Sequence, residues 1–197
     1  LSDLNKFVNI YPEFPQARLL RALVHKELGN SEKQLVDLAE ALHSQPSNPT
    51  LLKWRASIYL DEDKFALAKK HALLARLLAD DAETEMYLGV AYYNLGDADS
   101  AFYCMDQAIA QDATLLPPYL YAGTFGLELE DFERALKYLD LALMLDPRNS
   151  SALFYKGIAL AELDRLDEGC RCLRKAFYSG MDDASDYLTE YCFGKEN

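Results

Sequence analysis

The side chains best suited to catalysis or metal binding are few and widely spread in this sequence. His25, His43 and His71 are expected on separate turns or helix faces, away from the four cysteines, so no Cys/His set has zinc-ligand spacing. Residues 61–63 resemble the beginning of a calcium loop, but the required Gly and the twelfth-position Glu are missing. No nucleophile elbow, phosphate loop or dinucleotide fingerprint occurs. The sequence therefore predicts no enzyme, no metal site and no cofactor.

The composition indicates a protein with a buried core and a negative surface. Half of the 197 residues are hydrophobic, and the formal net charge is −12 with a pI near 4.6. This charge disfavours a nucleic acid partner, because phosphate binding requires a basic face. No apolar run approaches the roughly 20 residues of a membrane-spanning helix. We therefore expect neither nucleic acid binding nor a membrane span.

Small residues recur along the chain with a period of 33 or 34. Three series show it: Ala41, Ala75, Ala108, Ala142 and Ala176; Ala22, Ala56, Gly89, Gly123 and Gly157; and Ala68, Ala101, Ala135 and Gly169. In the third series Gln34 replaces the small residue of the first unit. Small side chains allow two helices to approach closely. Each unit is therefore expected to be a pair of amphipathic helices joined by a turn.

This pattern resembles the tetratricopeptide repeat (TPR) family, whose unit is a 34-residue helix-turn-helix. The family's aromatic, Leu-Gly, Tyr, Ala, aromatic, Ala and Pro positions are matched in two units by Leu88, Gly89, Tyr92, Ala101 and Ala108, and by Gly123, Phe132, Ala135, Ala142 and Pro147. The resemblance implies an all-α fold, a right-handed α-solenoid (superhelix) of about five TPR helix-turn-helix repeats with a C-terminal capping helix.

The repeats are predicted at residues 15–48, 49–81, 82–115, 116–149 and 150–181. Residues 1–12 are expected to form the second helix of a truncated preceding repeat, because their apolar positions have no first-helix partner, and we expect further sequence upstream. Residues 182–193 are predicted to be the capping helix, with Asp182 as its N-cap and 194–197 as a tail. Its apolar face shows i, i+3, i+4, i+7 spacing: Ala184, Tyr187, Leu188 and Tyr191.

In this family the first helices of the repeats line the ligand groove. Sorting the helix positions at about 100° per residue separates a core side from a groove side. The groove side carries an aromatic row with one leucine, namely Leu20, Trp54, Tyr87, Tyr121 and Tyr155. Beside it lie an apolar set, Met86, Leu120 and Phe154, and a mostly acidic row, Glu27, Asp61, Asn94, Glu128 and Glu162.

These rows predict a non-enzymatic protein–protein interaction scaffold that binds a peptide or helix of a partner protein. Aromatic side chains offer large contact areas, and the acids favour a basic or apolar partner. A competing interpretation stays open, in which the tyrosines pack on each other and the acids are solvated surface. A carboxylate clamp is not expected, because the groove positions supply few cations, chiefly Lys26 and Lys53.

An alternative function also stays open, a structural or assembly module that self-associates through residues 1–12 or docks to other domains of a longer polypeptide. The cysteines leave two alternatives open, a disulfide between Cys170 and Cys192 or two reduced thiols. In an antiparallel hairpin about Gly180, Cys170 and Cys192 lie nearly opposite each other, so a disulfide is feasible. With it, the protein belongs in a periplasmic or other extracytoplasmic compartment; with two reduced, half-buried thiols, the cytoplasm is equally acceptable.

Overall fold

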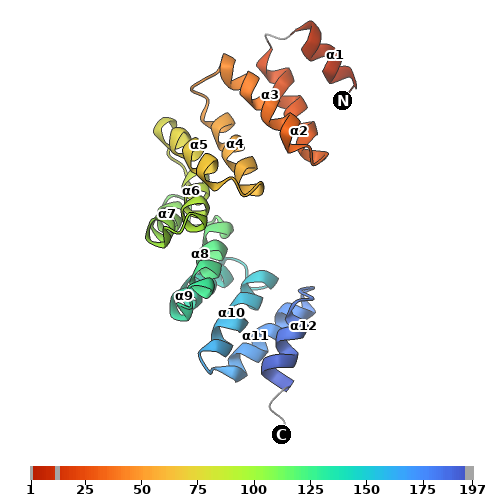
Figure 1. The fold of residues 1–197 in the computed structure, drawn as a ribbon. Helices are drawn as coiled ribbons and strands as arrows, with labels where there is room; N and C mark the ends of the chain where they lie inside the picture. Colours follow the sequence, from red (N-terminus) through yellow and green to blue (C-terminus); the bar gives the residue numbers. More distant parts are fainter. Residues whose placement is uncertain (1, 12–13, 194–197) are drawn as a thin grey trace. The chain divides into compact units, whose positions relative to one another are not determined.

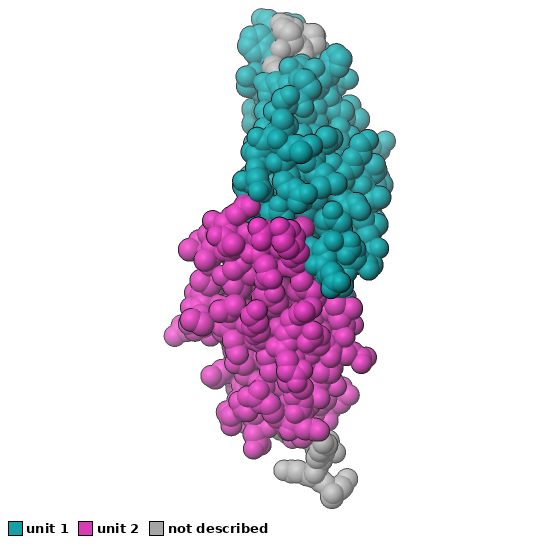
Figure 2. All heavy atoms as spheres, turned by 90° about the vertical axis from the view of Figure 1, so that its left-hand side faces the viewer, with its two compact units in different colours: residues 1–101 teal, residues 102–197 magenta. Residues whose placement is uncertain are grey.

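A computed structural model describes residues 2–11 and 14–193 of the chain. It divides into two compact units, residues 1–101 and residues 102–197, which Figure 2 shows in different colours. The described residues of both units form helices and turns, without a β-strand. The expected all-α repeat solenoid is therefore the fold of this chain. In the described part of the chain, no helix has the length and apolar character needed to cross a bilayer.

Unit 1 is built from successive helices that Figure 1 traces from red to yellow-green. They are α1 (Ser2–Ile10), α2 (Pro15–Glu27), α3 (Ser31–Ser44), α4 (Pro49–Asp61), α5 (Phe65–Leu78) and α6 (Ala82–Asn94). The helix α7 (Ala98–Gln111) contains the division between the units. Unit 2 continues with α8 (Leu116–Glu128), α9 (Phe132–Leu145), α10 (Ser150–Glu162), α11 (Leu166–Tyr178), α12 (Ala184–Tyr187) and the π-helical segment η1 (Leu188–Phe193).

The helices fall two by two within the residue ranges of the five predicted repeats, and the turns explain the pairing. Each turn from a first to a second helix contains one residue with a left-handed φ between 56° and 84°, namely Gly29, Asp63, Gly96, Glu130 and Asp164. Such a residue reverses the chain within a few positions, so the two helices of a pair become antiparallel neighbours within each unit: α2 with α3 and α4 with α5 in unit 1, and α8 with α9 and α10 with α11 in unit 2. The first helices are α2, α4, α6, α8 and α10.

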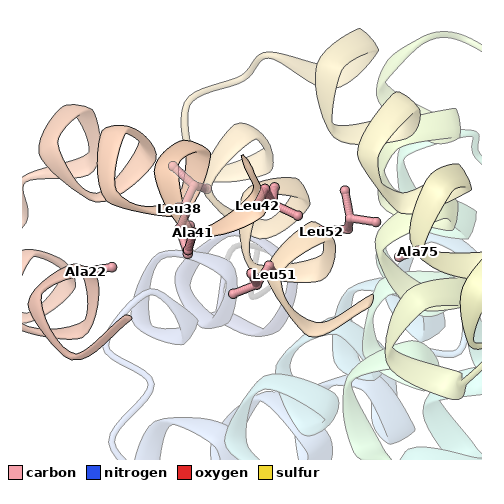
Figure 3. Close-up of a cluster of buried hydrophobic side chains, with 8 residues drawn as sticks. Ala22, Leu38, Ala41, Leu42, Leu51, Leu52 and Ala75 are labelled. Atoms are coloured by element: carbon pink, nitrogen blue, oxygen red, sulfur yellow. The ribbon is translucent and has the colours of Figure 1, made fainter. Parts of the chain in front are cut away.

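Buried small residues form the contacts between helices, as the period predicts. In unit 1, Ala22 of α2, Ala41 of α3 and Ala75 of α5 are fully buried. Figure 3 shows them beside the leucines of the same cluster, Leu38 and Leu42 of α3 and Leu51 and Leu52 of α4. The core of unit 1 is therefore continuous from α2 through α5.

The end of unit 2 is closed by a cap that is shorter than predicted. The α-helical part begins at Ala184, and Asp183 rather than Asp182 takes the N-cap position, without a side-chain capping hydrogen bond. Ala184 and Leu188 are buried against α10 and α11. Cys170 of α11 and Cys192 of η1 are joined by a disulfide, with their Cα atoms 5.9 Å apart. The predicted tail 194–197 lies outside the described residues.

Candidate partner-binding surface

A pocket of about 400 Å³ lies within unit 1, where three first helices and the α2–α3 turn meet. The helix α2 contributes Leu23 and Lys26, α4 contributes Trp54 and Asp61, and α6 contributes Tyr87. Three members of the predicted groove, Trp54, Asp61 and Tyr87, therefore line one pocket. Its volume lies in the range of small-ligand sites, roughly 300–1,000 Å³.

The aromatic walls of this pocket are held in place by the rest of unit 1. Trp54 is half-buried and packs against the leucine cluster of α3 and α4. The Tyr87 hydroxyl donates a hydrogen bond to Glu83 Oε1 over 2.9 Å. Burial, followed by the charge of Glu83, raises the pKa of Tyr87, so its hydroxyl stays protonated and keeps donating.

Lys53 ties the beginning of α6 to α4. Its Nζ lies 2.9 Å from Asp81 Oδ2 and 2.8 Å from Glu83 Oε2. Desolvation opposes the charge of Lys53, but these two carboxylates outweigh it and raise the lysine pKa. Asp81 is the N-cap residue of α6, and its carboxylate also accepts hydrogen bonds from the backbone N–H and the hydroxyl of Thr84. This network fixes Glu83, and through it the Tyr87 ring, against α4.

The two other charged side chains of the pocket, Lys26 and Asp61, are differently placed. Both are exposed, and the structure shows no ion pair between them in the part of the chain it describes. Lys26 and Asp61 therefore keep their charges available to an occupant of the pocket. Leu20, which is 51% exposed, and Glu27 belong to the predicted groove but do not line this pocket.

In unit 2 the predicted groove residues differ in their exposure and in their contacts. Tyr121 is 40% exposed and lies against Phe125 of its own helix, with ring centroids 6.1 Å apart. Tyr155 is half-buried beside Phe154. Glu162 is exposed but accepts a hydrogen bond from the Tyr191 hydroxyl of the cap. A residue of the cap is thus hydrogen-bonded to Glu162, which the sequence places in the acidic row of the predicted groove.

The expectation that Phe154 faces an open groove is wrong. Its side chain is only 7% exposed, because Tyr187 of the cap packs edge-on against its ring at 5.1 Å. It belongs to the core cluster formed with Leu173 and Leu188. Phe154 therefore stabilises the end of unit 2 and is not a contact residue for a partner.

The remaining predicted residues are placed individually. Met86 and Leu120 are half-buried, and Glu128 is exposed. The Asn94 side chain donates to the Val90 carbonyl of its own helix over 2.9 Å. None of these four lines the unit 1 pocket. Their assignment to a partner-binding surface stays a prediction.

Comparison with known proteins identifies the repeat. A tetratricopeptide repeat model matches residues 127–169. The fold is similar to that of YrrB, a TPR protein with an unusual peptide-binding site, with a TM-score of 0.69 and 16% identity over 95% of this chain and 97% of that one. The chain is a tetratricopeptide repeat protein.

Other solved structures share the fold of this TPR protein. PilF of Pseudomonas aeruginosa is similar with a TM-score of 0.76 and 16% identity over 95% of this chain and 86% of that one. A chain of the APC/C hetero-tetramer Cut9–Hcn1 gives a TM-score of 0.81 and 14% identity over 96% of this chain and 38% of that one. No curated protein matches the sequence. The TPR fold is that of a protein–protein interaction scaffold, and such scaffolds are typically non-enzymatic.

Two features of this TPR protein were not predicted from its sequence. In the sequence Gln34 is an oversized member of a small-residue series, and in the structure it lines the pocket. Phe7, Tyr11 and Phe14 form an exposed aromatic cluster at the beginning of unit 1, with ring centroids 4.9 to 6.3 Å apart. The interruption of the small-residue series was a usable signal for Gln34, whereas the aromatic cluster joins residues at the end of α1 to Phe14, a contact that no helix periodicity predicts.

Proposed function

We propose that this TPR protein binds a peptide segment of a partner protein in the pocket between α2, α4 and α6. The observation that carries the proposal is that three residues selected from helix geometry alone, Trp54, Asp61 and Tyr87, line the same pocket. A protein of similar fold, YrrB, is described as having an unusual peptide-binding site, which supports this use of the fold.

Rigidity gives the pocket its binding capacity. Trp54 is packed on the core, and Tyr87 is bonded to a carboxylate that Lys53 also holds. These side chains lose little freedom when a peptide binds, so most of the entropic cost falls on the peptide. In unit 2, Tyr121 and Tyr155 are separately proposed as contacts for the partner, by the same reasoning from their helix positions. We propose no catalytic step at either surface.

A peptide selection tests this function directly. Random twelve-residue peptides displayed on phage are selected on the immobilised 197-residue chain, and the affinities of enriched peptides are measured by the fluorescence of Trp54. We expect affinity to fall about tenfold or more in Tyr87→Ala and in Asp61→Arg, which changes an exposed wall and leaves the core intact. Tyr103→Ala, at an exposed tyrosine outside the pocket, is the matched control. Failure to enrich any peptide, or equal binding by all three variants, would refute the proposal.

A specific observation favours self-association as a second function. Phe7, Tyr11 and Phe14 are each more than 40% exposed, and they lie beside the exposed Ile10. A contiguous apolar surface of this kind is typical of a protein interface. We expect a Phe7→Ser, Ile10→Ser variant to remain monomeric while the parent chain dimerises with increasing concentration. Sedimentation measurements that show a monomeric parent at high concentration would exclude this function.

A further inference from the structure

Gln34 is an unusual residue for its position in the repeat. The equivalent positions hold Ala68, Ala101, Ala135 and Gly169, whereas Gln34 carries a carboxamide and is still only 5% exposed. Its side chain lines the pocket of unit 1, and no described side chain or backbone group forms a hydrogen bond with its amide. The amide is therefore open to the pocket, and an occupant that bonds to it gains a hydrogen bond.

The directions of the existing hydrogen bonds leave acceptors open in the pocket. The Tyr87 hydroxyl donates a hydrogen bond to Glu83 Oε1, and Lys53 Nζ donates one to Glu83 Oε2. Glu83 is therefore the acceptor of both hydrogen bonds. Among the lining residues, the Asp61 carboxylate and the Gln34 carbonyl oxygen can accept hydrogen bonds, while the Gln34 NH₂ group and the Lys26 ammonium can donate them. An occupant with several N–H donors therefore fits this wall.

The shape and charge of the pocket narrow the choice further. Trp54 and Tyr87 line the pocket, and a planar cation stacks favourably on an aromatic ring. Asp61 supplies a negative charge without an ion-pair partner among the described residues. A guanidinium group is planar, positively charged and carries five N–H donors, whereas an ammonium is a compact point charge. Lys26 opposes a cation, but its exposed, flexible side chain can turn towards solvent.

We propose that the unit 1 pocket accepts an arginine side chain of the bound peptide. The guanidinium stacks on the aromatic faces of Trp54 and Tyr87 and donates hydrogen bonds to Asp61 and to the Gln34 carbonyl oxygen. This inference rests on the proposed function, since it names the side chain that the same site recognises.

A small-molecule titration tests the inference without knowledge of the partner. The probe is Nα-acetyl-arginine amide, added to ¹⁵N-labelled protein, and the reporter is the indole N–H of Trp54, the chain's single tryptophan. We expect saturable shifts with a dissociation constant of about 1 mM, as suits one side chain. The citrulline amide, which has the same outline without the charge, should bind about tenfold more weakly. The lysine amide should also be weaker.

Three variants and a control assign the contacts. Asp61→Asn should weaken arginine binding about tenfold, and Gln34→Ala about threefold without loss of thermal stability, since alanine is the residue of other repeats. Lys26→Met should strengthen binding about threefold by removing the opposing charge. Glu32→Gln, a change at an exposed acid of α3 that belongs neither to the pocket nor to the predicted groove, should alter it less than twofold.

The outcomes separate this inference from the proposed function. Equal shifts with arginine and citrulline, stronger binding of a phenylalanine amide, or an unchanged Asp61→Asn variant would overturn the arginine assignment. If phage-selected peptides bind in the pocket but tolerate arginine-to-citrulline exchange, peptide binding stands and the arginine assignment fails. If the arginine probe binds as expected but no peptide is enriched, the pocket chemistry stands and the proposed function fails.

Discussion

Replacing Gly126 with alanine should destabilise unit 2, although alanine is the better helix former. Gly126 lies in α8, where it faces Ala135 of α9. A Cβ atom added to Gly126 would lie 2.8 Å from the Ala135 nitrogen and 3.0 Å from its Cα and Cβ atoms. Ordinary contacts are about 3.5 Å, so the two helix backbones must separate by about 0.7 Å.

The size of the effect follows from two opposing contributions. Alanine gains up to about 1 kcal/mol over glycine in a helix interior. Forcing extra atoms into a packed core costs about 1–3 kcal/mol, and the upper part of that range applies because the obstructing atoms are backbone atoms that cannot rotate away. We therefore expect Gly126→Ala to lower the free energy of unfolding by about 1–2 kcal/mol.

Gly123 provides a matched comparison on the same helix. Its added Cβ would lie 2.7 Å from the Cγ and Cδ2 atoms of Leu139, which belong to a side chain. Leu139→Ala should therefore make room for Gly123→Ala, and the pair should show a favourable coupling of about 1 kcal/mol. Ala135→Gly should not rescue Gly126→Ala, because the nitrogen and Cα atom of residue 135 remain in the way.

Chemical denaturation followed by far-UV circular dichroism measures all of these variants. Trp54 lies in unit 1, so its fluorescence is the wrong probe for this experiment. The reasoning is refuted if Gly126→Ala is as stable as the parent, or if Ala135→Gly rescues it as well as Leu139→Ala rescues Gly123→Ala. Either result would mean that the α8–α9 contact yields easily.

Three further predictions concern other parts of the fold. Arg21 Nε and Nη2 lie 2.9 and 2.5 Å from the carboxylate of Asp37, which is 1% exposed, so Arg21→Ala should cost about 3–5 kcal/mol in a denaturation experiment. Desolvation, aided by nearby cations, lowers the pKa of His71 to about 4, so the unfolded chain binds this proton first as the pH falls. His71 should therefore make the free energy of unfolding fall between pH 6.5 and pH 4 by up to about 1.4 kcal/mol per pH unit, and His71→Leu should remove this contribution. Alkylation of the denatured chain should label two cysteines before reduction and four after it, and reduction of the Cys170–Cys192 bond, which spans 22 positions, should cost up to about 3 kcal/mol.

The helical framework is predictable from sequence because its signal is local and repeated. Each small residue at a helix contact restricts the neighbouring helix directly, and the same requirement returns in every unit. Ala22, Ala56 and Ala108 illustrate this, since all three are fully buried. The turns add a second periodic feature, but only Gly29 and Gly96 show it in their residue type; Asp63, Glu130 and Asp164 adopt the same backbone conformation.

The candidate site is only partly predictable, for a physical reason. The side of a helix on which Trp54, Asp61 or Tyr87 lies follows from its position in the repeat, so angular sorting selects three residues that line one pocket. Sorting fails for Phe154, because a segment beyond the last repeat folds back and covers it. The periodicity of one helix shows which residues share a face. It does not show whether a distant segment of the chain packs on that face.

The pocket of unit 1 is lined by Gln34, the residue at which the small-residue series is interrupted, so its contribution to binding can be separated from helix packing. At the position of Gln34 the other units keep a small residue that only spaces two helices. Gln34→Ala should therefore leave the unit 1 helices as they are while removing the buried amide that an arginine would use. Loss of binding in a variant of unchanged stability would separate recognition from framework, because a residue needed only for packing would lower both together.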